Sequence, residues 1–521
     1  MASGIPIRSS LHSVALCAFA YLYVFPYFPA INNPNENVRL YMTAALAEEG
    51  RYEIDTLRKR WGWVNDAARF KGHVYSVKAP GTSYLAVPAY AAYHALATPF
   101  DRTVALWLCR LTASILPTLA FLVLFHRFLC RTAQHTGASP AVREAVFFSI
   151  ALGSLLYGYA ILLVSHTTCA AAAFAGLALL WPAPGAAPPG AKRAGTAGLL
   201  IATVTLLEYP GFVVSVALAC FGLARTWRRR AATVAFILGG LVPTLAMMHF
   251  QWSAFDSPFT PGHLFVESQR FRARHHEGFY GAVGVSWEAV YGLFLAPGRG
   301  LFPLTPVTLF AVPGFYILAR ARATRAPAIT AIASCAATAL AITSMNNWSG
   351  GWTIGPRYLA VTMPFLGWAA LVGLGACERI APAWTATIAI ACTVVGLVLS
   401  GLPSAYYPHL PPEVERPVGD VIVPLWSADL APYNAGQLLG LDGNVSMLPL
   451  LLCALLAVYR CAGRSQSQSK PGLLRAGCRL AAGLAAGLLV ASLLAAPQDM
   501  GPHRTKQTQG ALRFIKRTWV D

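Results

Sequence analysis

Charged residues are scarce in this chain. They make up 12% of its 521 residues and only 21 residues are acidic, whereas 56% are hydrophobic and the mean hydropathy is +0.52. Apolar residues in such excess must be arranged in repeated long blocks. The core of a water-soluble domain is too small to bury them. The composition therefore excludes an ordinary soluble enzyme and predicts an all-α polytopic membrane protein.

Several chemical signatures are also missing. The chain contains no Gly-rich phosphate motif after a strand, no paired zinc-ligand spacing and no serine–histidine–acid arrangement. Its 11 cysteines occur singly, and none lies in the polar loops at 32–83, 251–300 or 401–445. This distribution is typical of buried, inert thiols. The sequence thus disfavours a nucleotide-dependent enzyme and indicates neither a metal nor another cofactor, although a divalent metal is left open.

Most of the charge that is present is basic. The chain has 40 lysines and arginines and a net charge of +19. These residues concentrate between apolar blocks, which is the pattern that sets membrane orientation and attracts anionic lipid. We therefore expect membrane lipid, and no nucleic acid, as a partner.

Long apolar blocks predict about thirteen transmembrane helices, since a span needs about 20 apolar residues. The blocks lie near 11–31, 104–125, 144–163, 167–182, 195–224, 231–250, 301–320, 326–345, 357–376, 382–400, 446–460 and 477–496. If the N-terminus is cytoplasmic, the basic stretches "RTWRRR" and "RARATR" also fall on the cytoplasmic side. The basic C-terminal tail then lies on the exported side, so the last span is the least consistent with the rule.

Two segments decide this count. Residues 84–98 are too short for a span and contain Pro88, so we expect a helix that lies in the membrane interface. Residues 195–224 are too long for one span and have basic groups at both ends, so they must turn back on themselves. Glu208-Tyr209-Pro210 supplies the turn, because proline removes a backbone donor and biases the preceding residue away from helix.

This topology brings most of the unusual polar residues to the exported face. They are Glu36 and Arg39 in "PNENVR", Lys78 in "YSVKAPG", His166 in "SHTTC", Glu208, Arg299 in "APGRGLF" and Arg357 in "WSGGWTIGPRYL". Any one of them alone is explained by solvation, snorkelling or local capping. Taken together they predict a site, because ionisable residues at membrane depth are costly and usually line a cavity.

The residue types suggest roles at this site. A carboxylate facing cations across a pocket can deprotonate an acceptor hydroxyl while arginine and lysine hold a departing phosphate. We expect Glu36 to be the base, near a short amphipathic helix from about Val38 to Glu49 that carries Arg39. The other substrate-binding candidates are Asn35, Arg39, Lys78, His166, Glu208, Arg299 and Arg357.

The segments "NENVRLYMTAALAEEGRYEID" and "YSVKAPGTSYLAVPAY" resemble a known arrangement. An exported loop with an acidic pair, followed by Lys-Pro-Pro-like residues that open a juxtamembrane helix, resembles the polyprenyl-phosphate-sugar-dependent glycosyltransferases of the GT-C superfamily. Protein O-mannosyltransferases and lipid A aminoarabinose transferases are examples. The similarity covers about the first 210 residues as a pattern. Asn35 stands where the family usually has the first acid, and His166 stands where a second acid is usual.

The resemblance implies a GT-C-like fold with juxtamembrane helices in the first exported loop. It also implies single-step, inverting transfer of a sugar from a polyprenyl-phosphate donor to a hydroxyl or amine of an unknown glycan, lipid or protein acceptor. The expected location is the bacterial inner membrane, with the active site on the exported face.

The sequence suggests three regions and leaves two rival functions open. Residues 1–250 form the expected catalytic module with exported loop 32–103, residues 251–300 form a loop that covers the site, and residues 301–521 hold the C-terminal helices with exported loop 401–445. A transporter or flippase of a lipid-linked or anionic substrate is the first rival, although the two halves show no matching repeats. A catalytically inactive homologue is the second, because of Asn35.

Overall fold

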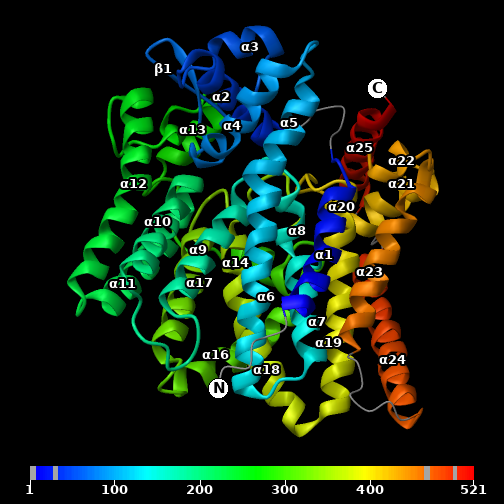
Figure 1. The fold of residues 1–521 in the computed structure, drawn as a ribbon. Helices are drawn as coiled ribbons and strands as arrows, with labels where there is room; N and C mark the ends of the chain where they lie inside the picture. Colours follow the sequence, from blue (N-terminus) through cyan, green and yellow to red (C-terminus); the bar gives the residue numbers. More distant parts are fainter. Residues whose placement is uncertain (1–6, 27–32, 463–469, 497–500, 521) are drawn as a thin grey trace.

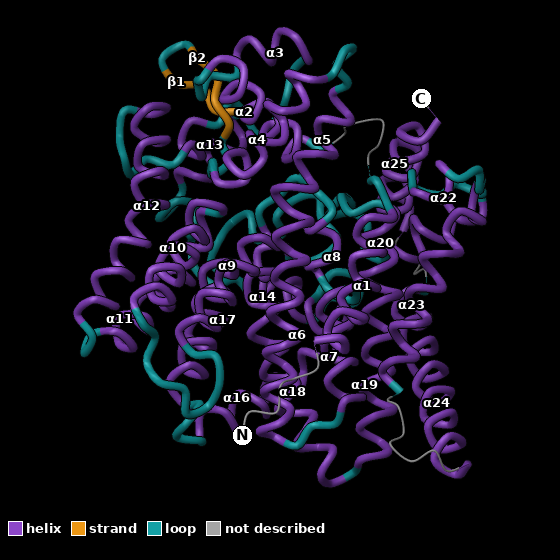
Figure 2. The backbone as a smooth tube through the Cα atoms, in the orientation of Figure 1, coloured by secondary structure: helices purple, strands orange, loops and turns teal. Residues whose placement is uncertain are grey.

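The computed structural model of the protein describes residues 7–26, 33–462, 470–496 and 501–520, and these are mostly helical (Figures 1 and 2). The longer elements are α1 (Ile7–Tyr23), α2 (Pro34–Glu49), α3 (Asp55–Trp61), β1 (Ala67–Phe70), β2 (His73–Ser76), α4 (Gly81–Leu96), α5 (Arg102–Arg110), α6 (Leu116–Thr136), α7 (Pro140–Ala151), α8 (Leu155–Ala160), α9 (His166–Leu180), α10 (Ala191–Leu207), α11 (Phe212–Thr226), α12 (Arg230–Phe255), α13 (Gln269–His276), α14 (Trp287–Phe294), α16 (Ala311–Arg320), α17 (Arg325–Thr343), α18 (Met363–Ile380), α19 (Pro382–Gly396), α23 (Leu448–Cys461), α24 (Lys470–Ala495) and α25 (Gly501–Val520). Shorter pieces are η1 (Leu111–Ile115), η2 (Tyr209–Gly211), η3 (Gly262–Phe265), α15 (Leu301–Leu304), η4 (Pro306–Phe310), η5 (Arg357–Thr362), η6 (Leu397–Gly401), α20 (Leu402–Tyr406), η7 (Val418–Ile422), α21 (Val423–Ser427), α22 (Ala435–Leu438) and η8 (Gly443–Met447).

Eight helical stretches in the described part of the chain are long and apolar enough to cross a membrane. They are Arg102–Thr136, Tyr209–Thr226, Arg230–Phe255, Arg325–Thr343, Arg357–Ile380, Pro382–Tyr406, Gly443–Cys461 and Leu474–Ala495. Shorter apolar helices, among them α9, run beside them (Figure 1). The all-α polytopic membrane fold is therefore confirmed, whereas the count of thirteen spans stays a prediction.

One predicted span, near 144–163, is not continuous. Helix α7 ends at Ala151 and α8 begins at Leu155 after a break in which Ser154 caps the new helix. The Ser154 hydroxyl accepts a hydrogen bond from the Leu156 amide at 3.2 Å. The Gly153-Ser154 pair is a short stop signal, and the apolar residues on both sides of it mask it in the sequence.

A cap of short elements covers one end of the bundle. It contains α2, α3, α4, α5 and the antiparallel hairpin of β1 and β2, with α13 beside them (Figures 1 and 2). The cap has its own apolar core, which includes Tyr41, Leu57 and Tyr90. Helix α4, with Pro88 inside it, packs on α2 within this cap and is not among the span candidates, as expected of the interface helix predicted over 84–98.

Helix α2 begins about one turn before its predicted start at Val38. The Asn33 side chain accepts a hydrogen bond from the Asn35 amide, and Pro34 occupies the first helical position. Asparagine followed by proline is a strong helix start, because the side chain satisfies a free amide and proline lacks one. The early start adds Asn35 and Glu36 to the helix that carries Arg39.

The predicted turn inside 195–224 is confirmed. Helix α10 ends at Leu207, Glu208 is extended, and η2 leads into α11. The arms of 17 and 15 residues are about 25 and 22 Å long at 1.5 Å per residue. Glycine packing fixes this hairpin against α12, because a Cβ atom on Gly198 would come within 2.0 Å of the Phe236 carbonyl oxygen.

Candidate active site

A carboxylate and an ammonium group meet at the base of the cap hairpin. Asp66 precedes β1 and Lys78 follows β2, and the hairpin brings the Lys78 Nζ atom to 3.1 Å from Asp66 Oδ2. Asp66 adopts a left-handed backbone with φ of 61°, which is uncommon outside glycine and often marks a functional position. The Asp66 side chain remains 32% exposed, whereas that of Lys78 is 14% exposed.

The charge of Asp66 is stabilised by its neighbours. Burial alone would raise the pKa of the Asp66 carboxyl group, but the attraction and hydrogen bond of Lys78, with smaller contributions from Arg357 and Arg39, hold that pKa below its ordinary value. Asp66 is therefore ionised at neutral pH. The sequence analysis did not select this residue.

Arg39 reaches from α2 towards two other elements. Its guanidinium donates to the Asn35 carbonyl oxygen at 3.1 Å and to the Ser165 hydroxyl at 3.0 Å, and it lies 3.8 Å from Glu208 Oε2. The side chain is 1% exposed. Within the described chain, its Nε atom has no hydrogen-bond partner.

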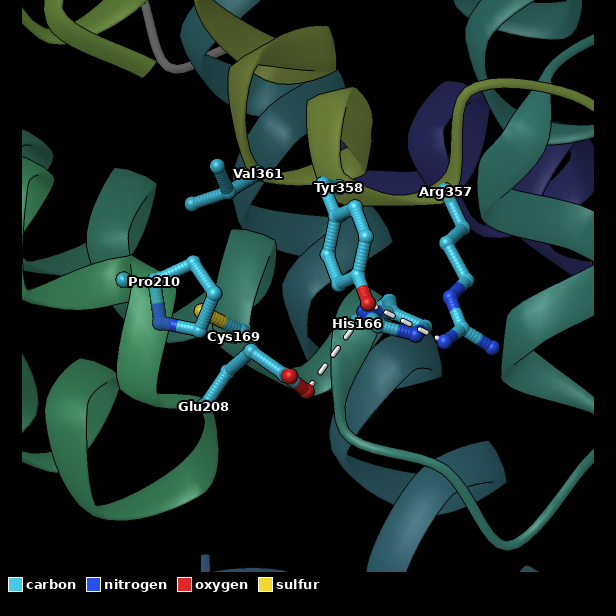
Figure 3. Close-up of a pocket in the computed structure, with 8 residues that line it drawn as sticks. His166, Cys169, Glu208, Pro210, Arg357, Tyr358 and Val361 are labelled. Carbon is cyan, nitrogen blue, oxygen red and sulfur yellow. Dashed lines mark hydrogen bonds and ion pairs between the residues drawn. The ribbon is translucent and has the colours of Figure 1, made fainter. Parts of the chain in front are cut away.

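The hairpin tip contributes the second carboxylate. Glu208 accepts a short hydrogen bond from the Ser165 hydroxyl and lies 3.5 Å from His166 Nδ1 at the start of α9. Figure 3 shows the Glu208 carboxylate directed at the His166 ring, in a pocket that Cys169, Pro210 and Val361 line on its apolar side. The pocket thus joins a charged wall to an apolar one.

Arg357 and Tyr358 close the pocket from η5 (Figure 3). An Arg357 Nη atom donates to the Tyr358 hydroxyl oxygen at 3.1 Å, and the guanidinium carbon lies 5.0 Å from the centroid of the same ring. Among the described residues, no carboxylate lies within ion-pair distance of Arg357, and its Nε atom has no hydrogen-bond partner. Arg357 is therefore a largely buried cation that its protein neighbours do not neutralise.

These groups act on one another electrostatically. Arg39 interacts with Glu208, Asp66 and Arg357, and Glu208 interacts with His166, Arg39 and Lys78. The cluster holds two carboxylates, Asp66 and Glu208, against three permanent cations. One positive charge is left over, which favours an anion as the ligand.

Glu36, the predicted base, lies outside this arrangement. Its carboxylate accepts hydrogen bonds from Arg110 at 2.7 and 2.8 Å and from the Leu163 amide at 2.6 Å. Glu36 is 0% exposed and Arg110 is 2% exposed. Because both oxygens are already occupied and no water reaches them, this geometry corrects the prediction. Glu36 is a structural residue that joins α2, α5 and the segment before α9.

Two other predicted site residues have supporting positions. Arg299 donates through one Nη atom to the carbonyl oxygens of Gly351 and Thr353, at 3.2 and 2.8 Å, so it braces the loop before Arg357. Asn35 is 5% exposed at the start of α2, where its carbonyl oxygen receives the Arg39 hydrogen bond. The structure thus brings Arg39, Lys78, His166, Glu208 and Arg357 together and leaves Glu36, Asn35 and Arg299 around them.

The segment after α12 is fastened to the cap beside Asp66. The Glu267 amide donates to the Ala67 carbonyl oxygen at 2.9 Å, and the Glu267 carboxylate accepts from Arg58 and Arg69. His263 lies in the same segment, where burial, together with the positive charge of Lys78, lowers its pKa to about 3. A neutral imidazole therefore stands close to Lys78 at physiological pH.

Sequence reasoning missed Asp66, Arg110 and Ser165. The left-handed Asp66 before a short hairpin gave a weak signal, since "VNDAARF" reads as an ordinary turn. Arg110 was absorbed into an apolar block, although an arginine inside a span usually has a carboxylate partner. Ser165 carries no sequence signal beyond its place next to His166.

The fold and the site together define a class: a helical membrane protein with a net-positive polar pocket at one end of its bundle. No protein-family model matches the sequence, and a comparison with curated protein sequences gives no match. Solved structures do match. The oligosaccharyltransferase of Archaeoglobus fulgidus in its apo form aligns with a TM-score of 0.50 and 12% identity, over 79% of this chain and 57% of that one.

Two further structures align over most of the chain. ArnT from Cupriavidus metallidurans bound to undecaprenyl phosphate gives a TM-score of 0.49 and 14% identity, over 96% of this chain and 76% of that one. The arabinosyltransferase EmbB from Mycobacterium smegmatis gives a TM-score of 0.43 and 14% identity, over 95% of this chain and 42% of that one. The protein has the GT-C fold, as its first exported loop suggested.

Proposed function

We propose that the protein is an inverting membrane glycosyltransferase that moves a sugar from a polyprenyl-phosphate donor to an acceptor at the exported face of the bacterial inner membrane. The GT-C fold supports this proposal, and one similar structure holds undecaprenyl phosphate. The proposed orientation, with the N-terminus in the cytoplasm, follows from the basic stretches between the spans.

The unneutralised guanidinium of Arg357 carries the proposal. A partly dehydrated arginine without a carboxylate partner is costly unless an anion joins it, and its planar fork suits phosphate. The pocket beside Arg357 has apolar residues on one wall, Cys169, Pro210 and Val361, and the first atoms of a lipid chain would meet this wall. A lipid-linked phosphate satisfies both features at once, and the excess positive charge favours it over a divalent cation.

Asp66 is the proposed base. It contacts Lys78 through one oxygen and remains 32% exposed, so an acceptor can reach it. Glu208 is less suited, because Ser165, His166 and Arg39 already surround its carboxylate. In the proposed step the acceptor oxygen attacks the anomeric carbon as Asp66 takes the acceptor proton. The bond between that carbon and the phosphate oxygen breaks, and the phosphate leaves with the electron pair beside Arg357 and Lys78.

Transfer of radiolabelled sugar from polyprenyl-phosphate donors by the purified full-length protein tests this function. We expect Asp66→Asn to lower kcat by about 10²- to 10⁴-fold, which is typical of the loss of a general base. Asp256→Asn is a matched control, since Asp256 also has a left-handed backbone and pairs with a lysine, Lys71, but is 56% exposed. Equal activity of the two variants would overturn the role of Asp66.

The same assay separates the rival functions. A transporter should carry its critical charges near the bilayer midplane, whereas these charges gather where several helices meet the cap. If the wild type transfers sugar from none of the donors, the enzyme proposal fails in favour of an inactive homologue.

A further inference from the structure

A tryptophan is held rigidly beside the proposed donor site and yet remains exposed. Trp352 precedes Arg357 in the loop "WSGGWTIGPR", and 37% of its surface is accessible. The residues on either side of it are clamped, because Arg299 binds the carbonyl oxygens of both Gly351 and Thr353. The Thr353 amide also donates to the Leu410 carbonyl oxygen at 2.6 Å. The backbone on both sides of Trp352 is thus fixed in place.

Two aromatic side chains from distant segments position the indole ring. The His409 ring centroid lies 5.7 Å from that of Trp352 at an interplanar angle of 39°, and the Phe514 centroid lies 5.7 Å away at 85°. Phe514 belongs to α25 in the C-terminal tail, so the tail and this loop lie on the same side of the membrane. Part of the ring thus packs against protein, while 37% of the residue remains accessible.

His409 links this aromatic group to the charged cluster. The charges of Arg357, Asp66 and Lys78 act on its ring, so it lies within electrostatic range of the proposed base and the proposed phosphate site. The donor pocket lies on the other side of Arg357 in sequence, at Tyr358 and Val361. Trp352 thus lies in the loop that leads directly into the donor pocket.

We propose that Trp352, with His409 packed beside it, is the stacking platform for a carbohydrate acceptor. This inference rests on the proposed function, since a donor held in the lipid phase leaves the solvent side of Asp66 for the acceptor. A preorganised aromatic face bordered by a few polar groups is what binding of a sugar ring needs, because ring C–H groups pack on the face while hydroxyls find hydrogen bonds. Trp348 in the same loop differs, because its ring packs against Gly292.

Binding to a printed array of hexose and pentose oligosaccharides tests the platform without requiring turnover. The probe is the full-length protein in nanodiscs whose lipids carry a fluorescent label. We expect Trp352→Ala to weaken binding by about tenfold or more and Trp352→Phe to have a smaller effect, since a shorter ring retains part of the stack. Thermal stability of each variant is measured alongside.

Trp384→Ala is the matched control, because Trp384 is 72% exposed at the start of α19. It follows α18, whose 18 residues carry the chain about 27 Å away from η5. Equal loss in Trp352→Ala and Trp384→Ala would assign Trp352 to the aromatic belt of the membrane interface and overturn the platform. Wild-type protein that binds no oligosaccharide would overturn it too.

The two proposals fail separately. Glycan binding through Trp352 without any sugar transfer would overturn the proposed function alone. Sugar transfer with an unchanged acceptor KM in Trp352→Ala would overturn the platform alone.

Discussion

Replacement of Glu36 by glutamine separates the structural carboxylate from the proposed catalytic one. Glu36 is 0% exposed and accepts three hydrogen bonds, two from Arg110 and one from the Leu163 amide. Glutamine keeps the shape of the side chain and one accepting oxygen. Its amide NH₂ group, however, is a hydrogen-bond donor that would face the Arg110 guanidinium, which is itself only a donor. The variant thus leaves the Arg110 charge buried without a counter-ion.

The expected cost follows from the burial of this pair. Removing one partner of a buried ion pair costs about 3–5 kcal/mol, because the other charge stays dehydrated. Arg110→Met should cost a similar amount. If the two losses were independent, the double variant would lose about 6–10 kcal/mol, whereas coupled partners should leave it close to a single variant.

Unfolding can be followed with a dye that reacts with thiols, since Cys17, Cys109 and Cys169 are buried in the folded protein. Purified wild type, both single variants and the double variant are heated in the same detergent. Asp256→Asn serves as the control, because breaking its exposed pair with Lys71 should cost at most about 1 kcal/mol. We expect a clear fall in melting temperature for each single variant and little further fall for the double variant.

One outcome would refute the reasoning. If Glu36→Gln melts like the wild type but abolishes sugar transfer at a temperature where it is folded, Glu36 takes part in the chemistry. Additive losses in the double variant would also refute the coupling of Glu36 and Arg110.

Three further predictions concern the pocket and its surroundings. Arg357→Lys should raise the donor KM about tenfold or more, because lysine lacks the planar fork, and an unchanged KM would argue against phosphate at this position. The pKa of the Asp66 carboxyl group is lowered in the folded protein. The ionised carboxylate therefore contributes its full stabilisation above the ordinary carboxyl pKa of about 3.9, and this contribution is lost as the pH falls through the lowered pKa. Lys78→Met should therefore move the acid limb of the pH–rate profile to higher pH, and a limb that stays in place would show that another group titrates. Glu267→Gln removes the charge that holds Arg58 and Arg69, so limited proteolysis should cut residues 256–286 faster than in the wild type, and equal cleavage would show that the backbone contacts suffice.

The fold was largely predictable because membrane burial imposes simple rules on sequence. Basic residues at both ends of 195–224 indicate that this segment crosses the membrane an even number of times, and Pro210 marks the position of the turn. Helix ends were less predictable, since the break before α8 rests on a two-residue signal. The class of fold thus follows from composition, whereas local breaks follow from single capping contacts.

The site was predictable only in part. Charges at membrane depth could be listed from the sequence, and Arg39, Lys78 and Arg357 do come together in the structure. The sequence favours Glu36 over Asp66 as the base because two carboxylates of the same loop differ only in their partners, and the partner of Glu36 lies 74 residues away. Long-range pairing of this kind leaves no local pattern.

The short arms of the α10–α11 hairpin have a consequence for the lipid around the protein. At about 25 and 22 Å they fall short of a hydrocarbon layer of about 30 Å, so in the proposed orientation the tip with Glu208 would lie several ångströms below the level at which a full span would emerge. A thicker bilayer would draw this tip deeper and a thinner one would raise it, at a modest energetic cost per ångström of mismatch. The acyl-chain length of the surrounding lipids would thus affect the site directly. Reconstitution into bilayers of graded thickness would change the depth of the Glu208 carboxylate without any mutation.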